Sequence, residues 1–349
     1  MTDRTSIAAA LAAALLFGAS MPFAKLLAGN LSPVLLAGLL YLGSGLGLWA
    51  ARLVRDRGFG PSRLRAGEWC WLGGAIACGG VLGPVLLMLG LNLMPASAAS
   101  LLLNLEAVLT ALLAWLVFRE NAGRRVVLGM MLIVAGGALL AWPAGGGTAA
   151  VSARGVLAVA GACLCWALDN NLTRKVSGAD ALFIAGTKGL AAGLTNLLLA
   201  AALGARAPQL PLAAGAMAVG LAGYGLSLAL FVVALRGLGS ARTGAYFSTA
   251  PFLGAAVAIA MLREPAPAAF WFAAVLMAAG VWLHLSERHD HEHTHQPLSH
   301  THPHRHDAHH RHEHDFNWDG TEPHVHPHRH EWLVHSHPHY PDLHHRHRH

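Results

Sequence analysis

Long apolar runs fill the first 285 residues, and short polar or charged stretches separate them. Each run is close to the roughly 20 residues that an α-helix needs to cross the hydrocarbon core of a bilayer. No strand-length alternation of apolar and polar positions appears, and lipid offers no partners to exposed backbone groups, so the spanning elements should be helices. We therefore predict ten transmembrane helices, at 6–28, 32–53, 69–91, 96–118, 124–142, 155–174, 181–203, 211–235, 241–262 and 266–285.

The apolar part contains an internal repeat. A shift of 144 positions sets Arg119-Glu120 against Arg263-Glu264, and it also aligns the apolar runs on both sides of this charged stop. Such self-similarity indicates a duplicated unit. Because five helices is an odd number, the second unit must run opposite to the first. Inverted repeats of this kind are typical of secondary transporters, whose substrate site lies near the bilayer midplane between the halves.

The predicted fold class is an all-α integral membrane protein of two inverted five-helix repeats, followed by a disordered His-rich tail. The predicted domains are a first repeat at 1–143, a Gly-rich linker at 144–153, a second repeat at 154–285 and the tail at 286–349.

Composition supports a membrane protein. The chain is 54% hydrophobic and only 12% charged, whereas a soluble domain has roughly a quarter of charged residues. The four cysteines lie in apolar runs without a framework spacing, so we expect buried small hydrophobes and neither disulfides nor metal ligands.

Charge gives the orientation. With a cytoplasmic N-terminus, most loop Lys and Arg residues lie inside, and only Arg154, Arg206 and Arg263 lie outside. This positive-inside bias predicts a bacterial inner (plasma) membrane protein with both termini in the cytoplasm. It also argues against nucleic acid as a partner, because the Arg residues sit in short loops between helices.

Particular residues resemble a known family, the EamA-type permeases of the drug/metabolite transporter superfamily. These residues are the 96–100 entry to the fourth helix (ASAAS), its Phe118-Arg119-Glu120 exit, the Gly-rich fifth helix, Trp166 and the 248–251 segment STAP. The resemblance implies export or exchange of small metabolites. In such permeases the fourth helix usually has Pro at its middle, as at Pro251 here, whereas this chain has Asn104-Leu105-Glu106.

Glu106 lies near the centre of the fourth predicted helix. A carboxylate there costs several kcal/mol unless it is protonated or paired, so we expect it to be functional, for example as a proton carrier in antiport. A structural ion pair or a neutral packed acid is the alternative. Asn104 points about 200° away around the helix, so the two side chains should not face the same cavity.

Other polar residues within the apolar runs are candidates for the transport path. Asp169 and Lys188 lie at similar depths, and we expect them to pair, either as a gate or as a permanent link between helices. Lys25 could instead extend to the membrane surface, and the remaining polar groups could serve as interhelical hydrogen bonds. The full candidate set is Lys25, Asn104, Glu106, Trp166, Asp169, Asn170, Lys188, Tyr224, Tyr246 and Ser248.

All 24 histidines lie at or after position 284, and most alternate with another residue. Imidazole is the commonest protein ligand for Zn²⁺, Ni²⁺ and Cu²⁺. We predict that the tail binds Zn, Ni or Co, although no single site is defined and a solvated polycation that binds metal incidentally is the alternative. The predicted ligands are His289, His291, His293, His295, His300, His302, His304, His306, His324, His326, His328, His330, His335, His337, His339, His345, His347 and His349.

The sequence thus predicts an inner-membrane secondary transporter of small metabolites or drugs, acting as an exporter and coupled to protons, with a metal-binding cytoplasmic tail. Its expected partners are the lipid bilayer, a small-molecule substrate and divalent metal ions. The sequence is also compatible with a homodimer. The alternatives are a divalent-metal transporter fed by the tail and a metal sensor that does not transport. An enzyme is not expected, because no nucleophile–base pair or cofactor loop is evident, and no cofactor is required.

Overall fold

The computed structural model describes residues 3–58, 62, 64–118, 124–142, 152–176, 179–286, 290–295, 298–304, 324–330 and 333–338. The chain divides into two compact units, Met1–Leu285 and Ser286–His349, and each is described by itself. Arg119, Glu120 and most of the predicted 144–153 linker lie outside the described residues. So do the predicted metal ligands His289, His306, His339, His345, His347 and His349.

Helices make up the first unit. The first repeat contains α1 (Asp3–Ala28), α2 (Pro33–Asp56), the short η1 (Ala66–Glu68), α3 (Trp69–Ala75), the π-helical η2 (Ile76–Leu82), α4 (Gly83–Leu93), α5 (Ala96–Leu102), α6 (Leu105–Phe118) and α7 (Arg124–Ala141). The second contains α8 (Ala153–Thr173), η3 (Arg174–Val176), α9 (Ala181–Ala202), α10 (Leu210–Gly220), the π-helical η4 (Leu221–Leu226), α11 (Ser227–Phe247), α12 (Ala250–Leu262) and α13 (Ala268–Leu285).

The described residues include ten helical spans that are long and apolar enough to cross a membrane, which confirms the ten predicted helices. Several of the spans are assembled from consecutive pieces. The third span joins α3, η2 and α4, and the fourth joins α5 and α6. One boundary differs from prediction, because α11 stays helical through the expected connection at 236–240. Pro95 interrupts the corresponding place in the first repeat, whereas the second repeat has Gly239 there, which keeps its backbone N–H.

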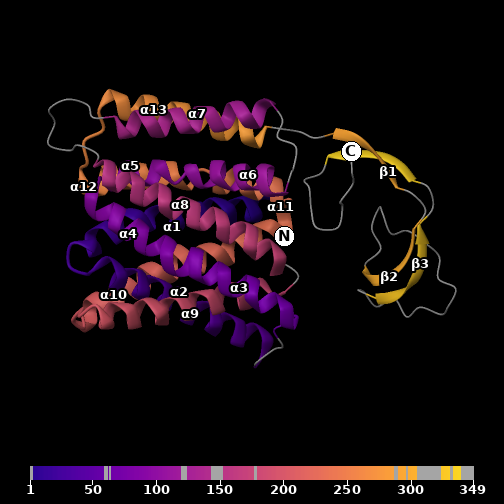
Figure 1. Ribbon diagram of the computed structural model, residues 1–349, viewed down its shortest axis with the longest axis horizontal. Coiled ribbons are helices and arrows are strands. Elements are labelled where there is room, and N and C mark those ends of the chain that lie inside the picture. The colour runs from indigo at the N-terminus through magenta and orange to yellow at the C-terminus, as the bar shows by residue number, and fades with distance from the viewer. Residues whose placement is uncertain are drawn as a thin grey trace. The chain divides into compact units, whose positions relative to one another are not determined.

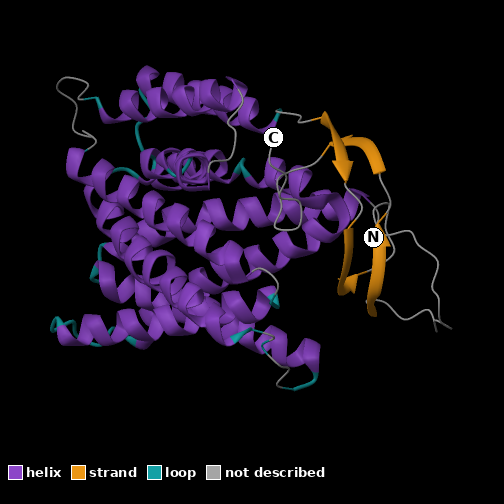
Figure 2. Cartoon of the chain, turned by 45° about the vertical axis from the view of Figure 1, so that its right-hand side comes forward, coloured by secondary structure: helices purple, strands orange, loops and turns teal. Residues whose placement is uncertain are grey.

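The helices form three layers, as Figures 1 and 2 show. Helices α7 and α13 make one outer layer, α2, α9 and α10 make the other, and α1, α4, α5, α6 and α8 lie between them. Corresponding helices of the two repeats pack on each other in the pairs α2–α9 and α7–α13, and α5 of the fourth span packs on α12 of the ninth. Helix α1 packs on α11 and α12, as α8 packs on α4 and α6. This reciprocal pattern is that of a two-fold related duplication.

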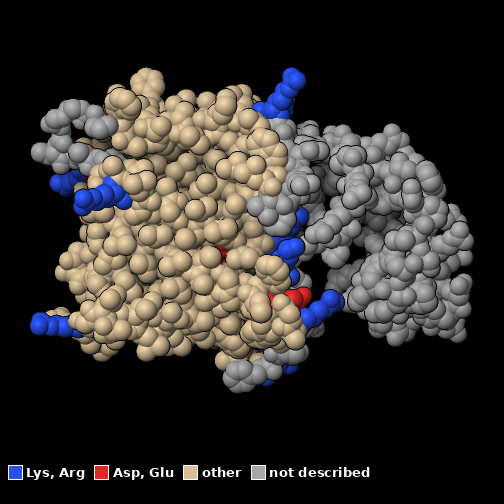
Figure 3. Space-filling view, viewed as in Figure 1, with Lys and Arg blue, Asp and Glu red and all other residues tan. Residues whose placement is uncertain are grey.

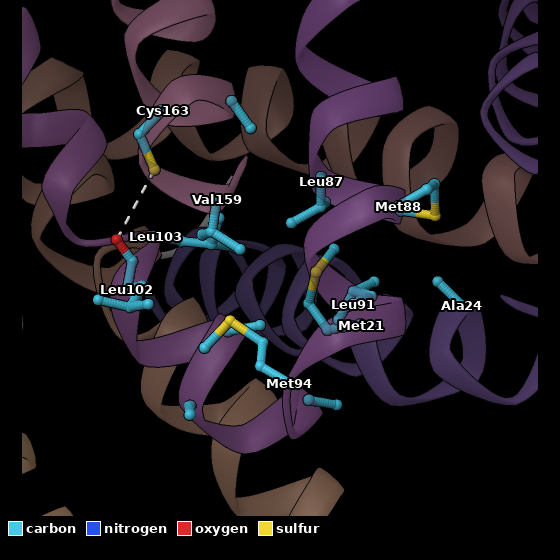
Figure 4. Packing of buried hydrophobic residues seen from close by; sticks show 14 of the residues in the cluster. Met21, Ala24, Leu87, Met88, Leu91, Met94, Leu102, Leu103, Val159 and Cys163 are labelled. Carbon is cyan, nitrogen blue, oxygen red and sulfur yellow. Dashed lines mark hydrogen bonds between the residues drawn. The ribbon is translucent and has the colours of Figure 1, made fainter. Parts of the chain in front are cut away.

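Small residues allow neighbouring helices to approach closely. A Cβ added at Gly189 of α9 would overlap the backbone of Gly45 on α2. Lipid tails are as apolar as the helix surfaces, so no hydrophobic effect drives membrane helices together. Close backbone contact of this kind therefore contributes to their association. Figure 4 shows part of the largest buried cluster, where Met21, Leu87 and Met88 are fully buried.

The outer surface of the helical unit is largely apolar, as expected of a surface that contacts lipid. Large apolar side chains such as Leu157, Leu198 and Phe272 are about 70% exposed (72%, 72% and 68%). In the view of Figure 3, Lys and Arg side chains gather towards the two ends of the helices, and the band between these ends is almost free of them. This distribution is the one expected of a protein that spans a bilayer.

The second unit contains four strands, β1 (Asp290–His295), β2 (Leu298–His304), β3 (His324–His330) and β4 (Leu333–Pro338). They form two antiparallel ladders, β1 with β4 and β2 with β3. Alternation of His with Thr, Ser and Val has the two-residue period of a strand, and proline is tolerated in a two-stranded ladder because each strand has a free edge.

Candidate functional site: a polar cluster at the π-helical third span

A π-helical segment interrupts the third span of each repeat. The 144-position shift places η2 (Ile76–Leu82) on 220–226, which is almost the whole of η4 (Leu221–Leu226). A π-turn breaks the regular α-helical hydrogen-bond pattern and frees carbonyl groups for other donors, and such turns are frequent at functional sites. Gly79 lies at the middle of the span Ala66–Leu93, so the free carbonyls of η2 lie near the bilayer centre.

Side chains from three other helices occupy the carbonyls of η2. Tyr41 Oη of α2 and Trp166 Nε1 of α8 both donate to the Gly79 carbonyl, at 2.9 and 3.0 Å. Asn196 Nδ2 of α9 donates to the Gly80 carbonyl at 3.3 Å. The π-turn is therefore the point at which α2, α8 and α9 converge.

Asp169 and Lys188 form the predicted ion pair between α8 and α9. Lys188 Nζ donates to both carboxylate oxygens of Asp169, at 2.5 and 2.7 Å. Thr173, one turn further along α8, donates to Asp169 at 2.8 Å. The carboxylate also lies against η2, because a Cβ added at Gly79 would overlap its oxygen.

Glu106 joins the same region from the other side of α8. It lies in the first turn of α6, where Asn170 Nδ2 donates to Glu106 Oε1 at 2.9 Å. Asn170 is the chain neighbour of Asp169, so one helical segment contacts both carboxylates. We call the following set the polar cluster: Tyr41, Glu106, Trp166, Asp169, Asn170, Thr173, Lys188 and the carbonyls of Gly79 and Gly80.

An aromatic group adjoins the polar cluster at Tyr41. The Tyr41 ring lies 5.6 Å from Tyr224 of η4, and Tyr224 lies 5.9 Å from Phe17 of α1. Phe17 also contacts Phe247 at 5.5 Å. Tyr224 is thus close to the predicted path, although its contacts are aromatic and not with the charged groups.

The fourth span of the first repeat breaks between α5 and α6 without a proline. Asn104 Nδ2 donates to the Leu101 carbonyl at 2.8 Å. In the second repeat Ser248 Oγ donates to the Ala245 carbonyl at 2.7 Å, which is the same contact shifted by 144 positions. Cys163 Sγ of α8 lies 3.7 Å from the Leu102 carbonyl at the break (Figure 4). Side-chain donors thus satisfy the carbonyls that each helix break leaves free.

Three predicted path residues have their contacts elsewhere. Lys25 Nζ donates to the Met94 carbonyl at 3.0 Å and to that of Leu91, at the C-terminus of α4, where a cation is favoured by the helix dipole. Asn104 Nδ2 lies 3.9 Å from Met277 Sδ of α13. Tyr246 packs against the Ala10 and Ala234 cluster between α1 and α11. The four cysteines are free, and Cys163 is buried as predicted, whereas Cys70 is exposed.

The prediction missed several contributors. Tyr41 and Thr173 are single polar residues, and nothing in the residues around them indicates that they belong to the site. The free carbonyl of Gly79 is a backbone group, and the Gly79-Gly80 pair is the only feature of the sequence that marks its position. Glu264 was seen only as part of the charged stop, yet its carboxylate accepts from the backbone N–H groups of Ala96 and Ser97, at 2.7 and 2.8 Å.

A charged network at the end of α2 was also missed. Arg55 pairs with Asp180 at 2.9 Å, and Arg52, only 2% exposed, lies over the rings of Trp49 and Phe183. Partial burial acts to raise the pKa of the Asp180 carboxyl. Hydrogen bonds from Arg55 and from the Phe183 amide, with the charge of Arg52, outweigh burial and hold this pKa below its ordinary value.

Ten spanning helices, reciprocal packing of two halves and a polar cluster at their centre define a multi-pass membrane transporter. Residues 4–142 and 153–286 each match the EamA-like transporter family, and the chain belongs to that family. The two matched segments correspond to the two repeats.

Two further comparisons agree with this family. The chain is 28% identical over 286 residues to an "Uncharacterized transporter" of Methanothermobacter thermautotrophicus, and the match covers 78% of this chain and 83% of the relative. A solved structure described as "Crystal structure of protein" superposes with a TM-score of 0.59 at 22% identity, over 79% of this chain and 95% of the other. At that identity the likeness concerns the fold alone.

Proposed function

We propose that this transporter exports a small organic solute, a metabolite or drug, across the bacterial inner membrane by exchange for protons. The observation that carries the proposal is the contact between Glu106 and Asn170 beside the Asp169–Lys188 pair. Ionisable residues at this depth are costly and mark substrate or ion pathways. In inverted-repeat transporters the site lies near the midplane beside irregular helices, and α8 here packs both on the π-helical η2 and on α5 and α6 of the broken fourth span.

The two carboxylates differ in their partners, and this suggests different roles. Asp169 is held by the Lys188 ammonium group and the Thr173 hydroxyl. Glu106 accepts from the neutral amide of Asn170. A carboxylate with a neutral partner can take up a proton without leaving a buried cation unpaired. Glu106 is therefore the proton-coupling residue in this proposal, and the Asp169–Lys188 pair is part of the path.

Reconstituted proteoliposomes test the coupling. The probes are a panel of radiolabelled amino acids and lipophilic dye cations, and efflux is measured with and without an imposed pH gradient. We expect Glu106→Gln to lose stimulation by the gradient and to keep solute exchange between equal pH values, because the path remains while the titrating group is gone. The matched control is Glu68→Gln, at an exposed carboxylate in η1 that accepts from the Arg65 amide. Gradient-driven efflux by Glu106→Gln at the wild-type rate would reject the coupling role.

The His-rich tail favours a second candidate, a divalent-metal transporter that the tail supplies. The same liposomes distinguish it when Zn²⁺ or Ni²⁺ replaces the organic probes, with the full chain compared with a truncation that ends at Ser286. Metal accumulation that requires the tail would favour this second function. Organic solute efflux that continues in the truncated chain would favour the first.

A further inference from the structure

The first turn of α5 receives its cap from the other repeat. Pro95 precedes this helix and provides no side-chain hydrogen bond to it, so the amide groups of the first turn need other partners. The Glu264 carboxylate supplies them, with one oxygen 2.7 Å from the Ala96 nitrogen and the other 2.8 Å from the Ser97 nitrogen. Hydrogen bonds to a charged acceptor are stronger than neutral ones. One side chain of the second repeat thus holds the end of a helix of the first.

The end of α12 directs Glu264 towards α5. Arg263 follows α12 with a left-handed backbone (φ 52°), a conformation that ends a helix and turns the chain. Helix α12 packs on α5, so the carboxylate that follows this turn reaches the neighbouring helix. The contact therefore joins the two repeats where the fourth span, Ala96–Leu113, begins.

Lys25 contacts the other side of the same helix break. Its ammonium group donates to the carbonyls of Leu91 and Met94 at the end of α4, immediately before Pro95. Glu264 is close enough to attract this ammonium group. A cation at the carbonyl end of α4 and an anion at the amide end of α5 therefore stabilise the break between the two helices.

The equivalent point of the second repeat has a different backbone. The 144-position shift places Ala96 and Ser97 on Ser240 and Ala241, which lie inside the continuous helix α11 (Ser227–Phe247). The amide groups of a helix interior bond to carbonyls four residues back and are not open to a carboxylate. At this point the first repeat is therefore broken and held by the opposite repeat, whereas the second repeat is straight.

We propose that Glu264 is a latch that keeps the extracytoplasmic side of the transport path closed, and that its contact with α5 breaks when the path opens to that side. The positive-inside pattern predicts that the end of α12 and the start of α5 lie outside the cytoplasm. Inverted-repeat transporters alternate by movement of one repeat against the other, so a bond between repeats at one membrane side must break when they separate there. The inference needs a transporter, which the family establishes, and neither the proton coupling nor the direction proposed above.

A cysteine at position 100 reports on the contact between the repeats. Ser100 lies one turn beyond Ala96 on α5, and a Cβ added at Gly254 of α12 would lie 2.9 Å from its hydroxyl oxygen. The Ser100 side chain is fully buried, and its hydroxyl has no hydrogen-bond partner among the described residues, so Ser100→Cys removes no such contact. A membrane-impermeant thiol reagent is applied to right-side-out and to inverted vesicles that contain the full chain with its four native cysteines replaced by alanine. The two labelling rates measure access from each side separately.

Three variants carry this reporter. Glu264→Ala removes the carboxylate. Ala96→Pro keeps the carboxylate and removes one amide hydrogen, at a first helical position where proline is accepted and after a residue that is already extended, as proline requires. Arg263→Asn is the matched control, because it removes an exposed neighbouring charge and asparagine accepts the left-handed backbone.

We expect labelling from the extracytoplasmic side to rise by about 10-fold in Glu264→Ala, the factor that corresponds to one hydrogen bond to a charged group. Ala96→Pro should give a smaller rise from the same side, because the Ser97 amide still contacts the carboxylate. Labelling from the cytoplasmic side should not rise in either variant. Arg263→Asn should label as the reporter alone does.

Three results would overturn the proposal. Unchanged extracytoplasmic labelling in Glu264→Ala would show that the carboxylate does not control opening. A rise from the cytoplasmic side as large as that from the other side would show a general loosening of the fold. An equal rise in Arg263→Asn would assign the effect to charge at this membrane end. If Glu264→Ala does not fold, Ala96→Pro decides by the same criteria. Because the reporter needs no solute and no pH gradient, a failure of the proton coupling leaves this test unaffected.

Discussion

The Asp169 and Lys188 side chains are only 10% and 16% exposed, and this burial determines how substitutions there should behave. Removing one partner of a buried ion pair leaves the other charge without compensation, which costs about 3–5 kcal/mol in soluble proteins. Removing both together avoids that cost. The pair also adjoins η2, since the Asp169 carboxylate lies against Gly79. Its loss should therefore affect the path as well as stability.

We predict strongly non-additive effects for this pair. Asp169→Asn and Lys188→Met should each lower the melting temperature in detergent, and the double variant should recover most of the loss, because no unpaired charge remains. Melting followed by size-exclusion chromatography measures this directly. The double variant should nevertheless transport more slowly than the wild type in proteoliposomes. A double variant as unstable as the sum of its parts would contradict the prediction, and wild-type transport by it would identify the pair as a purely structural link.

Some features of the polar cluster could be predicted from the sequence, and others could not. The spans, the repeat and the Asp169–Lys188 pair follow from hydropathy, self-similarity and depth, because each depends on residue type and spacing. The π-turn in η2 does not, because the carbonyl that it frees at Gly79 is a backbone group whose accessibility depends on local winding. The break at Asn104 was hidden for a related reason. Without a proline, the break is marked by side-chain contacts to the carbonyls of Leu101 and Leu102, which depend on the folded structure.

Within the third span, two glycines should respond in opposite ways to alanine. A Cβ at Gly79 would overlap the Asp169 carboxylate, whereas a Cβ at Gly73 would meet nothing within 4 Å. We expect Gly79→Ala to lower both the melting temperature and the transport rate, because it displaces Asp169. Gly73→Ala should leave transport unchanged and raise stability by up to about 1 kcal/mol, since alanine favours the helix. Equal behaviour of the two variants would show that the close approach at η2 has no role.

At the scale of the whole molecule, the reciprocal packing of the repeats relates each helix of one half to a helix of the other. Helix α1 contacts α11 and α12 as α8 contacts α4 and α6. Five spans per repeat mean that the chain must end its first repeat on the side opposite to where it began. The positive-inside pattern then predicts that both ends of the helical unit lie in the cytoplasm. The His-rich tail would thus face the cytosol.

Reporter fusions test this orientation at the ends of the two repeats. A fusion after Trp142 follows five spans, and a fusion after Ser286 follows ten. We expect alkaline phosphatase, which is active only in the oxidising periplasm, to be active after Trp142 and inactive after Ser286. A green fluorescent protein fusion, which folds in the cytoplasm, should give the converse result.

The outcomes separate the orientation from the repeat. Phosphatase activity after Ser286 alone would reverse the predicted orientation and place the tail outside the cytoplasm. Equal activity at both positions would contradict an odd number of spans per repeat, and with it the inversion of the second half. Because Arg154, Arg206 and Arg263 are the only loop arginines expected outside, replacing inside arginines such as Arg124 and Arg125 with alanine should weaken the bias and produce mixed orientations.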